Sequence, residues 1–254
     1  MEIPEDALKM FIDMFQNMGG KLNILENSVP VDQQVEYLEY SRKLRSKKQK
    51  KLTEKVFNQY SENLDSIELP IEEKKKILAL LALSSEVRAY RLLEQYAQHP
   101  DKELVNWSSM ALMESRISLE SELSDERQIY ISSGLGGKSG KMRFYVLITS
   151  STGAPFEDYQ RKVIETEFGY ILPQNDCEVE RLTIHDGYLE LVFLLPFAAN
   201  IRGILEKVVK ECNLYGDFLA HTFTVTNVKE FNQDEVNQIL TRNVKELKLK
   251  RRLR

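Results

Sequence analysis

The stretch Glu178–Leu195, EVERLTIHDGYLELVFLL, decides the fold of the second half of the chain. Apolar and polar residues alternate on both sides of Asp186-Gly187. An Asp-Gly pair between two segments of this kind is a strong signal for a tight β-hairpin. We therefore expect two antiparallel strands, Glu178–His185 and Tyr188–Leu195, joined by a short turn.

Further strands and helices surround this hairpin in a regular order. The apolar residues recur with period two in strands and with helical spacing between them. The expected elements are a short strand at 129–131, a strand at 142–149, a helix at 155–168, the hairpin, a helix at 198–212, a strand at 221–228 and a helix at 233–249 capped by Asn232. From 142 on, the order resembles the ferredoxin-like split βαβ sandwich. This resemblance implies a fold and names no function.

The first half of the chain has helical spacing throughout. Helices are expected at 8–15, after Asp32 as N-cap, after Pro70, after Ser84 or Ser85 as N-cap, and after Asp101 as N-cap. The segments SSEVRAYRLL and HPDKELVNWSSMALME within this half resemble HEAT-type helical repeats. An ordinary helix bundle remains the alternative, because the HEAT pattern is degenerate.

Length and composition agree with two domains. A chain of 254 residues with 42% apolar and 29% charged residues can bury two cores. We predict an α+β protein with an all-α N-terminal domain, HEAT-like or a bundle, at 1–125. A ferredoxin-like α/β sandwich domain at 126–231 follows, and then a C-terminal helix with a basic tail at 232–254.

Positive charge is concentrated in two windows, 42–51 and 245–254. Together they hold 13 of the 35 basic residues and one acid, Glu246, whereas the rest of the chain has 22 basic and 38 acidic residues. Segregated charge of this kind favours a polyanionic partner.

The segment Ser132–Lys141 is rich in glycine and contains Gly137-Lys138-Ser139. It is not a P-loop, because a strand rather than a helix is expected after it. We expect either a flexible hairpin connection or a mobile finger whose cations Lys138, Lys141 and Arg143 lie along a phosphate backbone.

Catalytic and metal signatures are absent from the sequence. His99, His185 and His221 are isolated, and the two cysteines, Cys177 and Cys212, are expected to be reduced thiols of a cytoplasmic protein. No apolar run is long enough to cross a membrane. We therefore expect no enzymatic activity, no cofactor, no metal and no membrane contact.

These observations predict a non-catalytic, cytoplasmic, RNA- or ribosome-associated protein that contacts phosphates electrostatically. One alternative is a protein–protein interaction adaptor or scaffold with a protein partner on its helical surface. A second alternative is a nucleotide-binding regulator. The predicted nucleic-acid-binding residues are Arg42, Lys43, Arg45, Lys47, Lys48, Lys50, Lys51, Lys138, Lys141, Arg143, Lys248, Lys250, Arg251, Arg252 and Arg254.

Overall fold

The computed structural model describes residues 21–46, 52–123, 128–197 and 199–252. The chain is α+β and divides into two compact units, Met1–Ser132 and Ser133–Arg254, the first mainly helical and the second built on a sheet. Each unit has its own hydrophobic core. The described residues do not include the helix expected at 8–15 or the basic residues Lys47, Lys48, Lys50, Lys51 and Arg254.

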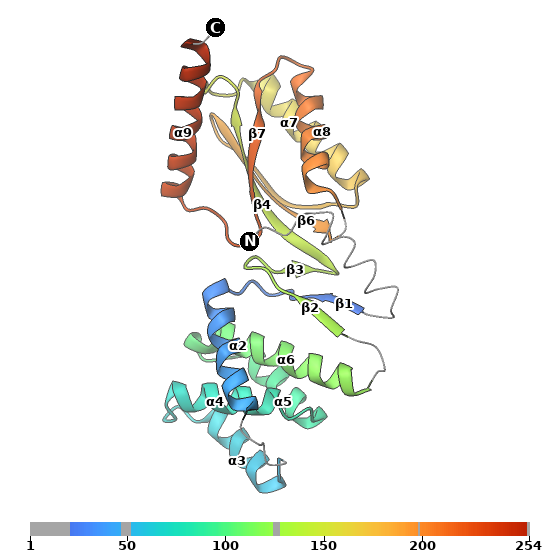
Figure 1. The fold of residues 1–254 in the computed structure, drawn as a ribbon, viewed down its shortest axis with the longest axis vertical. Coiled ribbons are helices and arrows are strands. Elements are labelled where there is room, and N and C mark those ends of the chain that lie inside the picture. Colours follow the sequence, from blue (N-terminus) through green and yellow to red (C-terminus); the bar gives the residue numbers. More distant parts are fainter. Residues whose placement is uncertain (1–20, 47–51, 124–127, 198, 253–254) are drawn as a thin grey trace. The chain divides into compact units, whose positions relative to one another are not determined.

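The first unit is organised around helix α6 (Val105–Leu123), which packs against α2, α4 and α5 (Figure 1). Pro70 directly precedes α4, and Glu72 and Glu73 occupy the first turn, as the sequence predicts. The elements beside α6 are β1 (Lys21–Ile24), α2 (Val31–Arg45), α3 (Glu54–Asp65), α4 (Ile71–Ala82), α5 (Val87–Gln98), a 3-10 turn (Lys102–Leu104) and β2 (Gln128–Ile131).

Three of the expected helix caps do not form. Helix α2 begins at Val31 after Pro30, so Asp32 lies in its first turn and does not cap it. Helix α5 begins after Glu86, and Ser85 has a φ of 52°, so neither Ser84 nor Ser85 caps it. Asp101 precedes the 3-10 turn, but its carboxylate accepts hydrogen bonds from Lys74 and Tyr96 instead of capping. Long-range partners thus override the local capping preference at Asp101.

The short strand expected at 129–131 belongs to the first unit. It forms β2, which pairs in parallel with β1 from Lys21↔Gln128 to Ile24↔Ile131. In the core of the unit, the rings of Tyr37 and Trp107 meet edge to face with their centroids 5.0 Å apart.

The second unit is an antiparallel sheet with helices on both faces. Its strands follow the order β3-β4-β6-β5, and β7 pairs with the other edge of β4. The elements are β3 (Gly137–Lys138), β4 (Lys141–Ser150), α7 (Asp158–Gln174), β5 (Glu178–Ile184), β6 (Tyr188–Pro196), α8 (Ile201–Asn213), β7 (Leu219–Thr226) and α9 (Gln233–Arg252). The predicted hairpin is confirmed: β5 and β6 pair around Asp186-Gly187, and the His185 N–H donates to the Tyr188 carbonyl at 2.9 Å.

Strand β4 is buried on both faces, although its sequence alternates. Val146 and Ile148 pack with α7 and α8, while Tyr145 and Leu147 pack with Val236 of α9. Figure 1 shows α7 and α8 on one side of the sheet and α9 on the other. Helix α9 therefore covers the face that an isolated sheet would leave to solvent.

Within the described residues, no helix has the length and apolar character needed to cross a lipid bilayer.

Candidate functional site

The first basic window begins in the last turn of α2. Arg42 and Lys43 are exposed and make no ion pair within the described part of the chain. Arg45 instead donates to Glu114 of α6 at 2.9 Å. The remaining cations of this window, Lys47, Lys48, Lys50 and Lys51, lie outside the described residues.

Glu114 gives Arg45 a structural role. This carboxylate is buried and also accepts hydrogen bonds from the hydroxyls of Tyr37 and Ser41, each at 2.7 Å. Burial, together with the neighbouring Glu114 charge, raises the pKa of Tyr37 well above its ordinary value, so Tyr37 stays a neutral donor. Arg45 supplies the counter-charge that a buried carboxylate requires.

The cations of the glycine-rich segment are paired with carboxylates of the same unit. Lys138 lies 3.0 Å from Glu178, and Lys141 lies 2.7 Å from Asp176. Arg143 donates to Glu180, and this hydrogen bond holds the pKa of Glu180 below its ordinary value. A phosphate-binding role for Lys138, Lys141 and Arg143 stays a prediction, and these contacts show that all three cations have partners within the protein.

The segment is also anchored through its backbone. The Leu135 N–H donates to the Asn227 carbonyl at 3.0 Å, and the Leu135 carbonyl accepts from Arg143 at 2.7 Å. A Cβ on Gly134 would lie 1.7 Å from the Val228 carbonyl oxygen, so glycine is required there. The segment is an ordered hairpin that enters strand β4, and no helix follows to receive a nucleotide phosphate.

The second basic window lies in helix α9. Asn232 and Glu235 cap each other's backbone N–H groups at 3.0 Å, which confirms the predicted helix start. Val236, Ile239 and Leu240 attach the first half of α9 to the sheet. The second half contains Lys245, Lys248, Lys250, Arg251 and Arg252, while Arg254 lies outside the described residues.

One polar cluster on the sheet was missed in the sequence. His185 is not isolated: its Nε2 lies 2.7 Å from Glu190, which also accepts a hydrogen bond from the Tyr145 hydroxyl at 2.5 Å. The His185 ring stacks on Tyr188 with centroids 4.3 Å apart. The hairpin register could have revealed this, because it brings residue 185 beside the start of β6.

Metal-binding geometry is not found in the described part of the molecule. No group of three or more His, Cys, Asp or Glu side chains there is arranged to hold a metal ion. Cys177 and Cys212 are free and buried.

Comparison with known proteins gives a limited structural likeness. No protein-family model and no curated protein matches the chain. Among solved structures, a candidate transposase from Deinococcus radiodurans matches at 13% identity and a TM-score of 0.35, covering 41% of this chain and 91% of that one. The REP-associated tyrosine transposase bound to a REP hairpin matches at 10% identity and a TM-score of 0.32, covering 46% of this chain and 68% of that one.

These findings correct the predicted function. Both matched structures are described as transposases. These matches do not support the predicted RNA or ribosome association or the predicted absence of enzymatic activity, and both predictions are withdrawn. The predicted RNA, ribosome and protein partners are withdrawn as well, together with the adaptor and nucleotide-binding alternatives. A likeness with these TM-scores assigns neither an activity nor a substrate to this chain.

Proposed function

We propose that this protein binds double-stranded DNA through the C-terminal half of helix α9. The proposal rests on the difference between the two halves of this helix: the first packs on the sheet through apolar residues, and the second is basic. Val236, Ile239 and Leu240 hold its first half on the sheet. The second half, from Lys245 to Arg252, contains five basic residues and one acidic residue.

The charge of the rest of the chain favours a specific use of this segment. The protein has a net charge of −4 in spite of its two basic windows, so most of its surface repels a polyanion. Duplex DNA carries about one negative charge per 1.7 Å of helix axis. A cationic helix on an otherwise acidic protein therefore directs the duplex to one place.

The helical form of the segment favours DNA over duplex RNA. The major groove of B-DNA is about 12 Å wide and admits an α-helix. The major groove of A-form RNA is deep and narrow, and protein side chains do not reach into it. Helix α9 has 20 residues and a length of about 30 Å, so its cationic half spans about 12 Å, a few base pairs.

Four of the other predicted nucleic-acid-binding cations fit this assignment poorly. Arg45, Lys138, Lys141 and Arg143 already neutralise carboxylates of the protein. Recruiting them to phosphates would leave those carboxylates unpaired, which costs part of the binding free energy.

The experiment compares binding of a fluorescent 20-base-pair DNA duplex with binding of a duplex RNA of the same sequence. We expect tighter binding of DNA. Reversing Lys248, Lys250, Arg251 and Arg252 to Glu should weaken DNA binding by about 100- to 1,000-fold, at roughly 1 kcal/mol per charge contact. The matched control is Lys207→Glu with Lys210→Glu on α8, where two exposed lysines lie on another helix.

The control variant should bind DNA as the unaltered protein does. The α8 variant reverses two charges and the α9 variant four. A loss of binding free energy in the α8 variant of about half that in the α9 variant would therefore show that the effect follows net charge, and would reject α9 as the binding element. Tighter binding of the RNA duplex would reject the preference for DNA.

We also propose a fold for each domain and a location for the protein in the cell. The order in which β7, β4, β6 and β5 lie in the sheet supports a ferredoxin-like domain at 133–231, without β2 and the other residues before 133. The packing of α4, α5 and α6 supports a HEAT-like or bundle domain at 1–125, and the segment 232–254 is the DNA-binding helix and its tail. A cytoplasmic location belongs to the same proposal and is supported by two free cysteines.

A further inference from the structure

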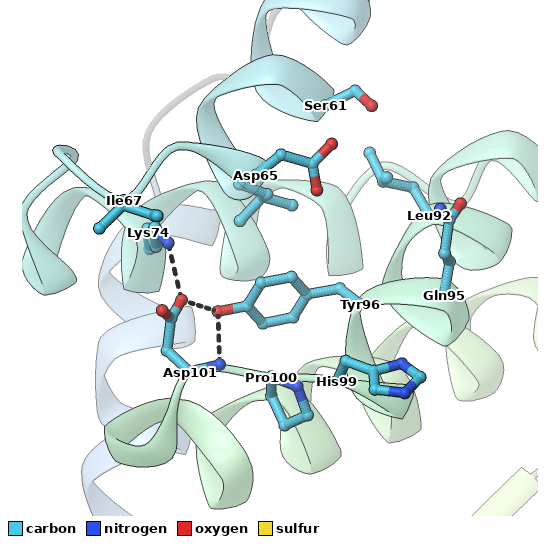
Figure 2. A pocket seen from close by; sticks show the side chains of 11 residues that line it. Ser61, Asp65, Ile67, Lys74, Leu92, Gln95, Tyr96, His99, Pro100 and Asp101 are labelled. Carbon is cyan, nitrogen blue, oxygen red and sulfur yellow. Dashed lines mark hydrogen bonds and ion pairs between the residues drawn. The ribbon is translucent and has the colours of Figure 1, made fainter.

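The helical unit contains a pocket between α3, α4 and α5 that the DNA proposal does not use. Its volume is about 340 Å³, which is within the range of small-molecule sites. Figure 2 shows the residues that line it, with the Tyr96 ring across the middle and Asp65 and Asp101 on either side.

One wall of the pocket is a buried ion pair. The Lys74 ammonium is 3% exposed and lies 2.7 Å from Oδ2 of Asp101. The Tyr96 hydroxyl donates to the same oxygen at 2.6 Å. These hydrogen bonds, that of Lys74 foremost, hold the pKa of Asp101 below its ordinary value, so Asp101 is ionised at neutral pH. The charge of Lys74 is thus already neutralised inside the protein.

The second carboxylate of the pocket is not neutralised. Asp65 is the last residue of α3, is exposed, and makes no hydrogen bond or ion pair within the described residues. Figure 2 shows its carboxylate on the pocket side, above the Tyr96 ring. The Asp101 side chain is 35% exposed. Among the Asp and Lys side chains that line the pocket, two carboxylates therefore lie beside one ammonium group.

The helix ends add negative potential at the same place. The pocket is lined by the C-terminal parts of α3 and α5, and neither helix has a basic residue in its last turn. A helix C-terminus carries partial negative charge from its unpaired carbonyl groups. The dipole of α3 favours a positive charge at its C-terminus, but the residue there is Asp65. A bound cation would compensate both the carboxylate and the helix end.

Apolar side chains complete the lining. Leu64, Leu92 and Pro100 contribute hydrocarbon surface beside the charged groups. A ligand that fits this lining has a cationic head and a short alkyl stem. An anion in the same place would approach the carboxylates of Asp65 and Asp101.

We propose that this pocket binds a small organic cation, an alkylammonium or alkylguanidinium ion, with its head between Asp65 and Asp101 and its stem against Leu92. The Lys74–Asp101 ion pair forms one wall of this site. Asp65 is the residue that selects the charge of the ligand.

The test is an NMR titration of the full chain, labelled with ¹⁵N, with n-butylammonium, n-butylguanidinium and n-butyrate as probes. We expect saturable shifts of the Leu92, Gln95 and Tyr96 amides with either cation, at a Kd in the range of about 1 mM for ligands of this size. Butyrate should produce no saturable shift at these amides.

The decisive variant is Asp65→Asn, which keeps the size of the side chain and removes its charge. It should weaken cation binding at least about tenfold. The control is Glu62→Gln, an exposed carboxylate on the same helix that does not line the pocket. Thermal unfolding of both variants should match that of the unaltered protein, because neither residue is buried.

Binding of butyrate at the same amides, unchanged cation binding in Asp65→Asn, or no saturable shift with either cation would overturn the proposal. An equal loss in Glu62→Gln would also overturn it, because the effect would then follow the charge of α3 rather than the pocket. None of these results depends on DNA binding, which the α9 variants test separately.

Discussion

Arg143 of strand β4 reaches across β6 and donates two hydrogen bonds to Glu180 of strand β5, at 2.5 and 2.8 Å. This pair ties the glycine-rich segment to the sheet, because Arg143 also donates to the Leu135 carbonyl. A cation bound in this way stabilises the fold and is not available to a ligand.

Replacing Arg143 with Ala should therefore lower stability and leave DNA binding unchanged. Charge-assisted hydrogen bonds at a half-buried site contribute modestly, so we expect a loss of about 1–2 kcal/mol in the free energy of unfolding. Urea denaturation and DNA-binding anisotropy on the same protein measure the two effects. If Arg143→Ala weakens DNA binding and leaves the free energy of unfolding unchanged, Arg143 contacts DNA and this account of its role is wrong.

Replacing Gly134 with Ala should be more damaging than its size suggests. The new methyl group would meet the Val228 carbonyl, and the backbone must move to accept it. We expect a loss of about 2 kcal/mol or more. Gly169→Ala is the matched control: it lies in α7 with open space around it and should gain about 0.5–1 kcal/mol in helix propensity. Equal melting temperatures for both variants would show that the segment is not anchored.

The Lys74–Asp101 pair should make the free energy of unfolding fall as the pH is lowered into the acidic range. The pKa of Asp101 is lower in the folded protein than its ordinary value of 3.8, so its contribution is present above that pH. The contribution is lost as the pH falls toward the folded pKa. Asp101→Asn should lose about 3 kcal/mol at pH 7, because Lys74 is left buried and unpaired.

The same variant should lose less further stability than the unaltered protein between pH 5 and pH 3. Urea denaturation at several pH values measures this difference, with Glu62→Gln as the control that should follow the unaltered protein. Parallel curves for the unaltered protein and Asp101→Asn would contradict the assignment.

Both cysteines should be inert in the folded protein. Burial raises the pKa of Cys177 to about 11 and that of Cys212 to about 12. At pH 8 almost no thiolate is present, and the thiolate is the reactive form. A chromogenic disulfide reagent should therefore label neither thiol until urea is added, after which both should react. Rapid labelling of one thiol without urea would show that it is exposed.

The sequence predicted the elements whose signals are local. The Asp-Gly hairpin, the start of α4 at Pro70 and the cap of α9 at Asn232 all depend on residues a few positions apart. Strand β1 was missed, because four residues, Lys21–Ile24, carry too little pattern to separate a strand from a loop.

The candidate site was predicted less well, because its charges are paired through the tertiary fold. Lys141 and Asp176 are 35 residues apart, and only the arrangement of β4 beside the end of α7 brings them together. Arg45 and Glu114 are separated by 69 residues, so a cationic window in the sequence does not reveal which of its members are already neutralised. The first half of α9 could be predicted from the sequence, because its apolar residues are the ones that pack on the sheet.

The salt dependence of duplex DNA binding tests the central claim most directly. The logarithm of the affinity should fall linearly with the logarithm of salt concentration, by about 0.9 for each phosphate neutralised. Reversal of Lys248, Lys250, Arg251 and Arg252 should reduce this slope by about 3 to 4, while the α8 control leaves it unchanged. A slope that is the same in the unaltered protein and in the α9 variant would contradict DNA binding through this helix.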